Sequence, residues 1–228
     1  MISILAATAL AAAAQAPCPD VVTAEAFICR AIHATADRKP DEAAQAFEQA
    51  AQQLTATDPQ VGKLYAAAGN SWIEANQPDK AALDLDKALA GPGLEAEQRG
   101  EALLDRARAA EAQDDLKTAR AKITEAKQSI SADPFLWFFS AALAIREGDA
   151  ATAKASIGQA LSISPADPMI LFEAGHVAQF AGDDVGARSY WNRVIERDPN
   201  GEAGQAARQA LKLLPVPVTV QPQPNAPK

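Results

Sequence analysis

The sequence predicts an all-α protein made of repeated helix pairs, and three observations support this fold class. The chain has 228 residues, of which 48% are hydrophobic but only 5% aromatic, so its core must consist mainly of alanine and leucine. Alanine has the highest helix propensity and lets helices approach closely. Runs of β-branched and aromatic residues typical of strands are nearly absent, and a pattern of small and apolar residues recurs along the chain.

The start of the chain differs from the rest and is typical of an export signal. Residues 4–14 form an uncharged apolar run that overlaps a small-x-small sequence at 14–16, the form that signal peptidase cleaves. The run is shorter than the roughly 20 apolar residues of a transmembrane helix. An uncleaved anchor is the alternative to a signal. No Lys or Arg precedes the run and Pro17 is unfavourable just after the cut, so cleavage after Ala14 is an alternative site. We expect a signal peptide at 1–16, an N-terminal strap at 17–23, a periplasmic or secreted mature protein and no membrane insertion after processing.

Both cysteines, Cys18 and Cys29, lie close together just after the expected signal. An exported protein reaches an oxidising compartment, where disulfides form and persist. A Cys18–Cys29 disulfide would tie the strap to the first helix and contribute about 3 kcal/mol in the chain-entropy model. Two unrelated thiols, one of them buried on a helix, are the alternative.

A triplet of small and apolar residues recurs five times in the chain. It has alanine first, an apolar residue four positions later and a small or apolar residue three positions after that. These are helical neighbour spacings, so each triplet predicts an apolar stripe on one helix. The leading alanines are 38, 38, 34 and 34 residues apart, and a turn signal precedes each of them. The triplets are Ala43, Phe47, Ala50; Ala81, Leu85, Ala88; Ala119, Ile123, Ala126; Ala153, Ile157, Ala160; and Ala187, Trp191, Val194.

An amphipathic stretch also precedes each turn, so every copy predicts a helix, a turn and a second helix. Asp caps free amides and Pro suits the first helical position, so four Asp-Pro pairs predict helix starts. These pairs lie at 58–59, 133–134, 167–168 and 198–199. The Gly-Pro-Gly sequence at 91–93 predicts an interruption, and the spacing of Ala and Leu predicts a helix at 202–214. Residues 215–228 are Pro-rich and polar, which predicts a disordered tail.

This pattern resembles the tetratricopeptide repeat, a 34-residue helix-turn-helix unit. The last two copies match best, with Ala153 and Ala187 at position 20 of the unit and Gly175 at position 8. Small residues at these positions let the two helices of one repeat touch. The resemblance implies a right-handed superhelical solenoid of about five repeats over residues 24–201, followed by a capping helix at 202–214. The two 38-residue intervals predict one extra helical turn each, before the second and the third repeat.

The resemblance also implies a partner-binding groove, because members of this family hold protein segments on a concave surface. Positions 2, 5, 9 and 12 of each first helix line that surface. Besides the residues expected to bind a partner, these positions in the second to fifth repeats hold Ala66, Ile73, Glu101, Leu104, Glu111, Ala142, Ile145, Met169 and Gln179. The groove residues that we expect to bind a partner are Lys63, Asn70, Arg108, Phe135, Phe138, Phe172 and His176. Core packing is the alternative role for the phenylalanines, and for Phe139 it is the expected one. Family members that bind a partner's terminal carboxylate use a Lys at position 5 and an Asn at position 9 of one repeat. Only Asn70 matches this pair, and position 5 of its repeat holds Ala66, so we exclude such a carboxylate clamp.

Charge and motifs argue against several other functions. The net charge of -8 disfavours nucleic-acid binding, because an acidic surface repels phosphates. His33 and His176 are interpreted as lacking a second His or Cys at a metal-ligand spacing, so no metal site is expected. Nucleophile-elbow, phosphate-loop and dinucleotide motifs are absent, so we expect no catalytic residue, no cofactor and no small-molecule substrate.

The sequence therefore predicts a non-enzymatic, exported adaptor or scaffold. It would bind a protein or peptide segment, from an envelope protein, in its concave groove. The alternative is a structural subunit of a homo-oligomer or envelope assembly that uses its convex face or its capping helix.

Overall fold

The computed structural model describes residues 17–215, and within that range it contains eleven α-helices and no strand. The predicted all-α class is therefore confirmed for the described residues. The expected signal peptide at 1–16 and the tail from residue 216 onwards lie outside them. The chain divides into two compact units, Met1–Glu95 and Ala96–Lys228, which are treated separately below.

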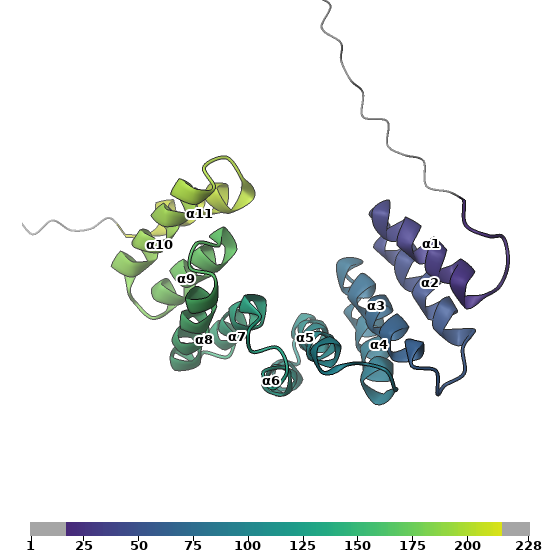
Figure 1. Cartoon of the computed structure of the whole chain (residues 1–228). Helices are drawn as coiled ribbons and strands as arrows, with labels where there is room; N and C mark the ends of the chain where they lie inside the picture. Colours follow the sequence, from purple (N-terminus) through teal and green to yellow (C-terminus); the bar gives the residue numbers. More distant parts are fainter. Residues whose placement is uncertain (1–16, 216–228) are drawn as a thin grey trace, which may run out of the picture. The chain divides into compact units, whose positions relative to one another are not determined.

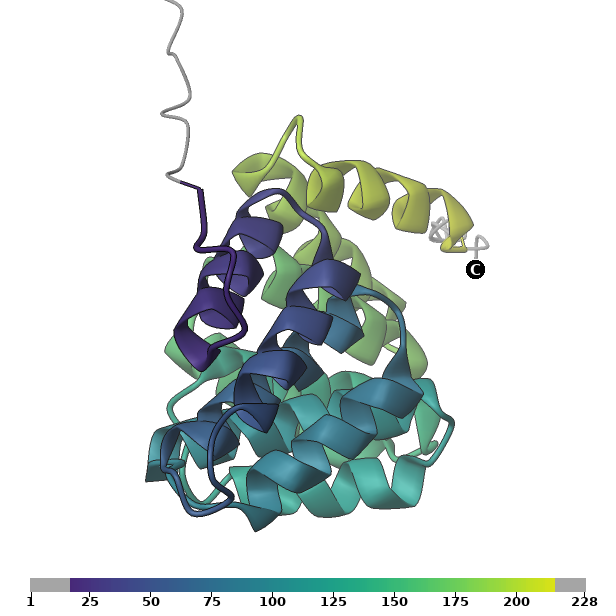
Figure 2. The ribbon, with the colours of Figure 1, turned by 90° about the vertical axis from the view of Figure 1, so that its right-hand side faces the viewer.

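Each unit consists of helices that pack against their neighbours in the chain (Figures 1 and 2). The first unit contains α1 (Ala24–Ala36), α2 (Pro40–Gln52), α3 (Gln60–Glu74) and α4 (Pro78–Ala90). The second contains α5 (Ala96–Ala112), α6 (Leu116–Ala126), α7 (Pro134–Arg146), α8 (Ala150–Ile163), α9 (Pro168–Phe180), α10 (Asp184–Arg197) and α11 (Glu202–Leu213). The last helix, drawn in yellow, packs on α9 and α10.

The turn inside each helix pair has one residue with a positive φ. These residues are Arg38, Asn76, Asp114, Gly148 and Gly182, with φ angles of 57°, 55°, 61°, 77° and 79°. They are spaced 38, 38, 34 and 34 residues apart, as are the leading alanines of the triplets. The five pairs therefore share one turn geometry, although the first three use residues other than glycine at a position that favours glycine.

The second helix of a pair begins in one of two ways. In α6, α8 and α10, an Asp side chain caps the helix by accepting a hydrogen bond from the backbone N–H three residues later. The caps are Asp115, Asp149 and Asp183. In α2 and α4 the side chain before the helix makes no capping bond, and proline takes the first turn. In the third, fourth and fifth copies, the aspartate that ends the turn therefore serves as the N-cap of the second helix.

The Asp-Pro pairs mostly mark helix starts, as predicted. Asp133 and Asp167 cap α7 and α9, and the side chain of Asp58 accepts a bond from the Gln60 N–H at the start of α3. The pair at 198–199 does not start a helix, because Asp198 follows the end of α10 and α11 begins only at Glu202. Its carboxylate instead reaches forward along the chain. It accepts a bond from the Gly201 N–H in the connection at 2.9 Å and one from the Gly204 N–H in the first turn of α11 at 3.4 Å.

The core of each helix pair lies along the predicted triplets. All five leading alanines are 0–1% exposed, and of the fifteen triplet residues only Phe47 is partly exposed. Glycines at position 8 of two first helices allow close contact with large side chains. A Cβ at Gly69 would lie 2.5 Å from Leu85 Cγ, and one at Gly175 would lie 2.1 Å from Trp191 Nε1. The two helices of a pair therefore touch where the repeat pattern requires small residues.

The two 38-residue intervals have different causes. The long α5, with 17 residues against 13 in α7, contains the predicted extra turn of the third copy. In the second copy α3 has only 15 residues, and the longer connection at 53–59 supplies the rest, so a full extra helical turn is wrong there. The Gly-Pro-Gly sequence lies in the connection between α4 and α5, just before the boundary of the two units.

A buried polar cluster joins α2, α3 and α4 in the first unit. The indole Nε1 of Trp72 donates to Glu48 Oε1 at 2.7 Å and to Asp84 Oδ2 at 3.2 Å. Lys87 Nζ lies 2.8 Å from Asp84 Oδ1, and Asp84 is 1% exposed. Burial raises the pKa of the Glu48 carboxyl, and the neighbouring Asp84 raises it further. Two carboxyl groups thus share one indole donor in the core.

A second polar cluster links α6 to α7 and α8. The Arg120 guanidinium forms two hydrogen bonds to Glu147 Oε2, at 2.5 and 3.1 Å, and one to Ser140 Oγ at 2.9 Å. Ser140 is fully buried, and its hydroxyl lies 3.0 Å from that of Ser156. Because the bonds join groups from three helices, this cluster connects the third repeat to the fourth.

Candidate functional site

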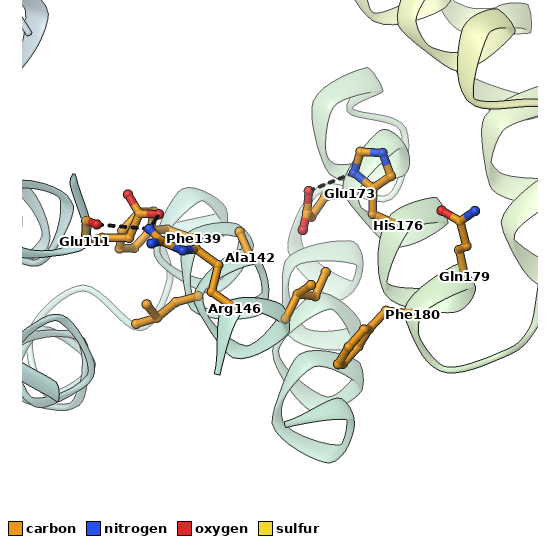
Figure 3. A pocket seen from close by; sticks show the side chains of 10 residues that line it. Glu111, Phe139, Ala142, Arg146, Glu173, His176, Gln179 and Phe180 are labelled. Carbon is orange, nitrogen blue, oxygen red and sulfur yellow. Dashed lines mark hydrogen bonds and ion pairs between the residues drawn. The ribbon is translucent and has the colours of Figure 1, made fainter. Parts of the chain in front are cut away.

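The second unit contains a surface hollow of about 510 Å³ between the carboxyl-terminal halves of α7 and α9 and the end of α5. Figure 3 shows its labelled side chains, with those of α7 facing those of α9. Its lining residues are Glu111, Phe139, Ala142, Leu143, Ile145, Arg146, Glu173, His176, Gln179 and Phe180. Four of these residues, Ala142, Ile145, His176 and Gln179, are groove positions of the fourth and fifth repeats.

The surface of the hollow combines apolar side chains with charged ones. Phe139, Ala142 and Ile145 come from α7, and Phe180 from the end of α9 is 40% exposed. Phe139, which the sequence analysis assigns to the core, is instead partly exposed and lines the hollow. An apolar surface bordered by a few polar groups is typical of sites that bind a ligand side chain.

On one side of the hollow, Arg146 forms a cationic group held between two helices. Its guanidinium forms an ion pair with the Glu111 side chain and donates to the Glu111 carbonyl at 2.9 Å. It also lies 2.7 Å from Asp114 Oδ1. The hydrogen bond to Glu111 raises the pKa of the Arg146 side chain. These contacts join α7 to the end of α5 and leave Arg146 beside the apolar surface.

On the other side, α9 presents a paired acid and imidazole. Glu173 is only 8% exposed, and its Oε2 lies 3.5 Å from His176 Nδ1. The imidazole also makes T-shaped contacts with two aromatic rings, with centroid distances of 4.4 Å to Phe172 and 5.5 Å to Trp191. This packing limits the rotation of His176, so the ring is held at the border of the hollow.

The other expected groove residues lie elsewhere. Lys63 and Asn70 are on α3 in the first unit, where Lys63 Nζ lies 3.8 Å from Glu95 Oε1 and Asn70 is partly buried. Arg108 on α5 lies 2.8 Å from Asp105 and places its guanidinium 5.7 Å from the centroid of the Phe135 ring.

The three expected phenylalanines also pack against their own surroundings. The rings of Phe135 and Phe138 stack with centroids 5.5 Å apart. Phe138 packs against the core of α7, α8 and α9, while Phe172 packs against the core that includes Trp191. Among the expected partner-binding residues, only His176 lines the hollow.

Sequence reasoning missed several lining residues because it used only four positions of each first helix. Phe139 and Glu173 occupy position 6, and Arg146 and Phe180 occupy position 13, of adjacent repeats. The same two positions contribute to the hollow in both copies. This correspondence between copies is the sequence signal that could have identified them.

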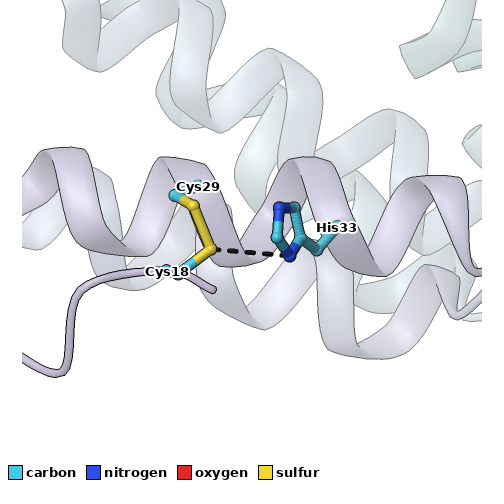
Figure 4. Close-up of side chains that lie close together, drawn as sticks. All are labelled: Cys18, Cys29 and His33. Carbon is cyan, nitrogen blue, oxygen red and sulfur yellow. Dashed lines mark hydrogen bonds between the residues drawn. A yellow bond between two sulfur atoms is a disulfide. The ribbon is translucent and has the colours of Figure 1, made fainter. Parts of the chain in front are cut away.

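A second cluster of reactive side chains lies at the N-terminal end of the first unit (Figure 4). The Sγ atoms of Cys18 and Cys29 are bonded at 2.04 Å, and the Cα atoms are 5.8 Å apart. His33 Nδ1 lies 3.6 Å from Cys18 Sγ. The interpretation of His33 as isolated from any cysteine is therefore wrong. Cys29 precedes it by one helical turn, a spacing that was readable in the sequence.

The helices within residues 17–215 are all unsuited to spanning a membrane. None of the helices there has the length and apolar character needed to cross a bilayer.

Comparisons with known proteins give structural matches only. The chain matches no family model and no curated protein. PilW, a widely conserved type IV pilus biogenesis factor, has 19% identity and a TM-score of 0.69, covering 81% of this chain and 82% of its own. YrrB, a TPR protein with an unusual peptide-binding site, has 18% identity and a TM-score of 0.62, covering 83% and 92%. PilF of Pseudomonas aeruginosa has 16% identity and a TM-score of 0.66, covering 84% and 83%.

Proposed function

We propose, on the premise that this chain has the tetratricopeptide-repeat fold of these solved structures, that it is an exported adaptor or scaffold. In this proposal it binds a segment of an envelope protein and carries out no catalysis. The observation that carries the proposal is the hollow of about 510 Å³, because it lies where the first helices of the fourth and fifth repeats face each other.

The side chains of the hollow suggest what kind of segment it binds. Its volume suits one or two large side chains, and Phe139, Ala142 and Ile145 offer them an apolar surface. Arg146, which is paired with Glu111 and Asp114, lies on one side of this surface, and the Glu173–His176 pair lies on the other, so polar groups border the apolar surface on both sides. We therefore propose a peptide with an apolar anchor and neighbouring polar or charged groups.

Three observations support the exported location and the protein partner. The apolar leader at 1–16 has the form of a signal, and the bonded Cys18 and Cys29 fit an oxidising compartment. One structural neighbour is named for pilus biogenesis and another for a peptide-binding site. Export also predicts the intact mass of the mature protein, which should correspond to a chain that begins between residues 15 and 17.

A filled hollow tests the proposed site. Residues 17–228 are used to select binding peptides from a displayed random library. The affinity of these peptides for Ala142→Trp should be at least about tenfold lower than for the wild type, because the indole would occupy the hollow. Ala155→Trp is the matched control, because Ala155 is exposed on α8 and does not line the hollow. Circular dichroism must show equal helicity for both variants. Equal peptide affinity for the wild type and a folded Ala142→Trp would contradict this site.

Light scattering distinguishes the adaptor from the assembly subunit. An adaptor is expected to be monomeric without its peptide, whereas a homo-oligomer would keep a higher mass that Ala142→Trp does not change. If an oligomer of the Ala142→Trp variant still binds the peptide, the peptide interacts with a surface outside the hollow.

A further inference from the structure

We propose that reduction of the Cys18–Cys29 disulfide creates a zinc site whose ligands are Cys18, Cys29 and His33. The two sulfur atoms and a ring nitrogen of His33 all lie within 4.8 Å of one another. Cys29 and His33 project from successive turns of α1, while Cys18 reaches them from the strap before the helix (Figure 4). This inference is independent of the proposed peptide site.

The distances suit tetrahedral coordination. With Zn–S and Zn–N bonds of roughly 2.3 and 2.1 Å, a tetrahedral site separates a sulfur and a nitrogen ligand by about 3.6 Å. Cys18 Sγ and His33 Nδ1 are already 3.6 Å apart. The two sulfur atoms would have to separate to about 3.8 Å once their bond is broken. The imidazole can therefore stay in place, provided that the two sulfur atoms separate while Cys18 Sγ keeps its present distance from His33 Nδ1.

The backbone on either side determines which cysteine moves. Cys29 is fixed in the middle of α1, whereas Cys18 lies in the irregular strap. Arg30 holds this strap to the helix, because its guanidinium donates to the carbonyl oxygens of Pro19 and Val21 at 2.9 and 3.0 Å. Once the disulfide is opened, Cys18 Sγ can therefore move the roughly 2 Å away from Cys29 Sγ that coordination requires, while the strap stays beside the other ligands.

The chemistry requires a reductant and then a metal ion. A dithiol reduces the disulfide with two electrons and two protons, giving two protein thiols while the dithiol becomes a disulfide. Zinc then displaces the two thiol protons and binds two thiolates and the neutral imidazole nitrogen. Two thiolates balance the charge of the ion, and this soft donor set suits zinc. All three side chains are partly exposed, so reductant and ion can reach them, and the fourth position is open to water.

Cobalt and zinc titrations of residues 17–228, reduced under anaerobic conditions, test this site. We expect one ion per chain, a cobalt spectrum with thiolate charge-transfer bands, and no binding to the oxidised chain. His33→Ala should weaken zinc binding by at least about tenfold, and His176→Ala, which alters the only other histidine, should leave it unchanged.

Arg30→Ala provides a variant that keeps every ligand. It should weaken zinc binding by severalfold, because the strap is no longer held over α1. Helicity is measured for each reduced variant, and X-ray absorption of the reduced wild type counts sulfur and nitrogen ligands without any substitution. The proposal is overturned if the reduced chain binds no more zinc than the oxidised chain. It is also overturned if the metal has only sulfur ligands, or if folded His33→Ala binds as tightly as the wild type.

Discussion

Replacing Gly175 with alanine adds one methyl group at the closest contact between α9 and α10. The new Cβ would lie 2.1 Å from Trp191 Nε1, 2.5 Å from Cδ1 and 2.6 Å from Cε2. Trp191 is fully buried, and its Nε1 donates to the Phe172 carbonyl oxygen at 3.0 Å. The ring therefore cannot move aside without losing that bond and disturbing the neighbouring core residues.

The expected cost is the balance of three effects. Overpacking a core costs about 1–3 kcal/mol, and the loss of the indole hydrogen bond adds about 1 kcal/mol. The higher helix propensity of alanine, compared with glycine, offsets this cost by about 1 kcal/mol. We expect Gly175→Ala to lower the free energy of unfolding by about 1–3 kcal/mol. Gly158→Ala on α8 is the matched control, because nothing lies within 4 Å of its added Cβ. The free energy of unfolding of this control should rise by up to about 1 kcal/mol.

Urea unfolding followed by circular dichroism and tryptophan fluorescence measures both variants. The two alanine substitutions should shift the midpoint in opposite directions with similar slopes. If Gly175→Ala is as stable as the wild type, or gains as much as Gly158→Ala, then α9 and α10 do not approach as closely as described and the repeat register is wrong.

Three further substitutions probe the turns and the polar clusters. Arg38→Gly should raise the unfolding free energy by about 0.5–1 kcal/mol in urea titrations, because glycine tolerates the positive φ; a loss would contradict the turn geometry. Glu48→Gln should stabilise the chain at neutral pH. Because the pKa of Glu48 is raised on folding, the wild-type chain is most stable when this carboxyl is protonated and loses stability as the pH rises above the ordinary value of 4.5. In thermal melts, the higher stability of Glu48→Gln should therefore vanish below that pH. Arg120→Ala should cost about 1–2 kcal/mol by removing the paired bonds to Glu147, whereas Lys122→Ala, which breaks a single ion pair to the exposed Glu125 within α6, should change stability little; equal losses would contradict a role for the cluster.

Much of the fold was predictable because the relevant forces are local. Helical spacing defined the buried stripes, and the leading alanines and Trp191 are buried as the triplets predict. Capping chemistry located the starts of α7 and α9 at Asp133 and Asp167. The same rule failed at 198–199, because the Asp198 side chain reaches N–H groups three and six residues ahead, at Gly201 and Gly204, so α11 begins only at Glu202.

The candidate site depended on contacts between segments that are distant in the sequence. Helical periodicity places Phe138 and Phe139 on adjacent faces of α7, but the packing of α7 against α8 and α9 decides which ring joins the core and which lines the hollow. Arg146 acquires its position from Glu111, 35 residues earlier. Cys18 meets His33 only because the strap folds back along α1. A pattern read along one helix identifies its apolar face, whereas the angle at which helices pack determines where that face leaves a space.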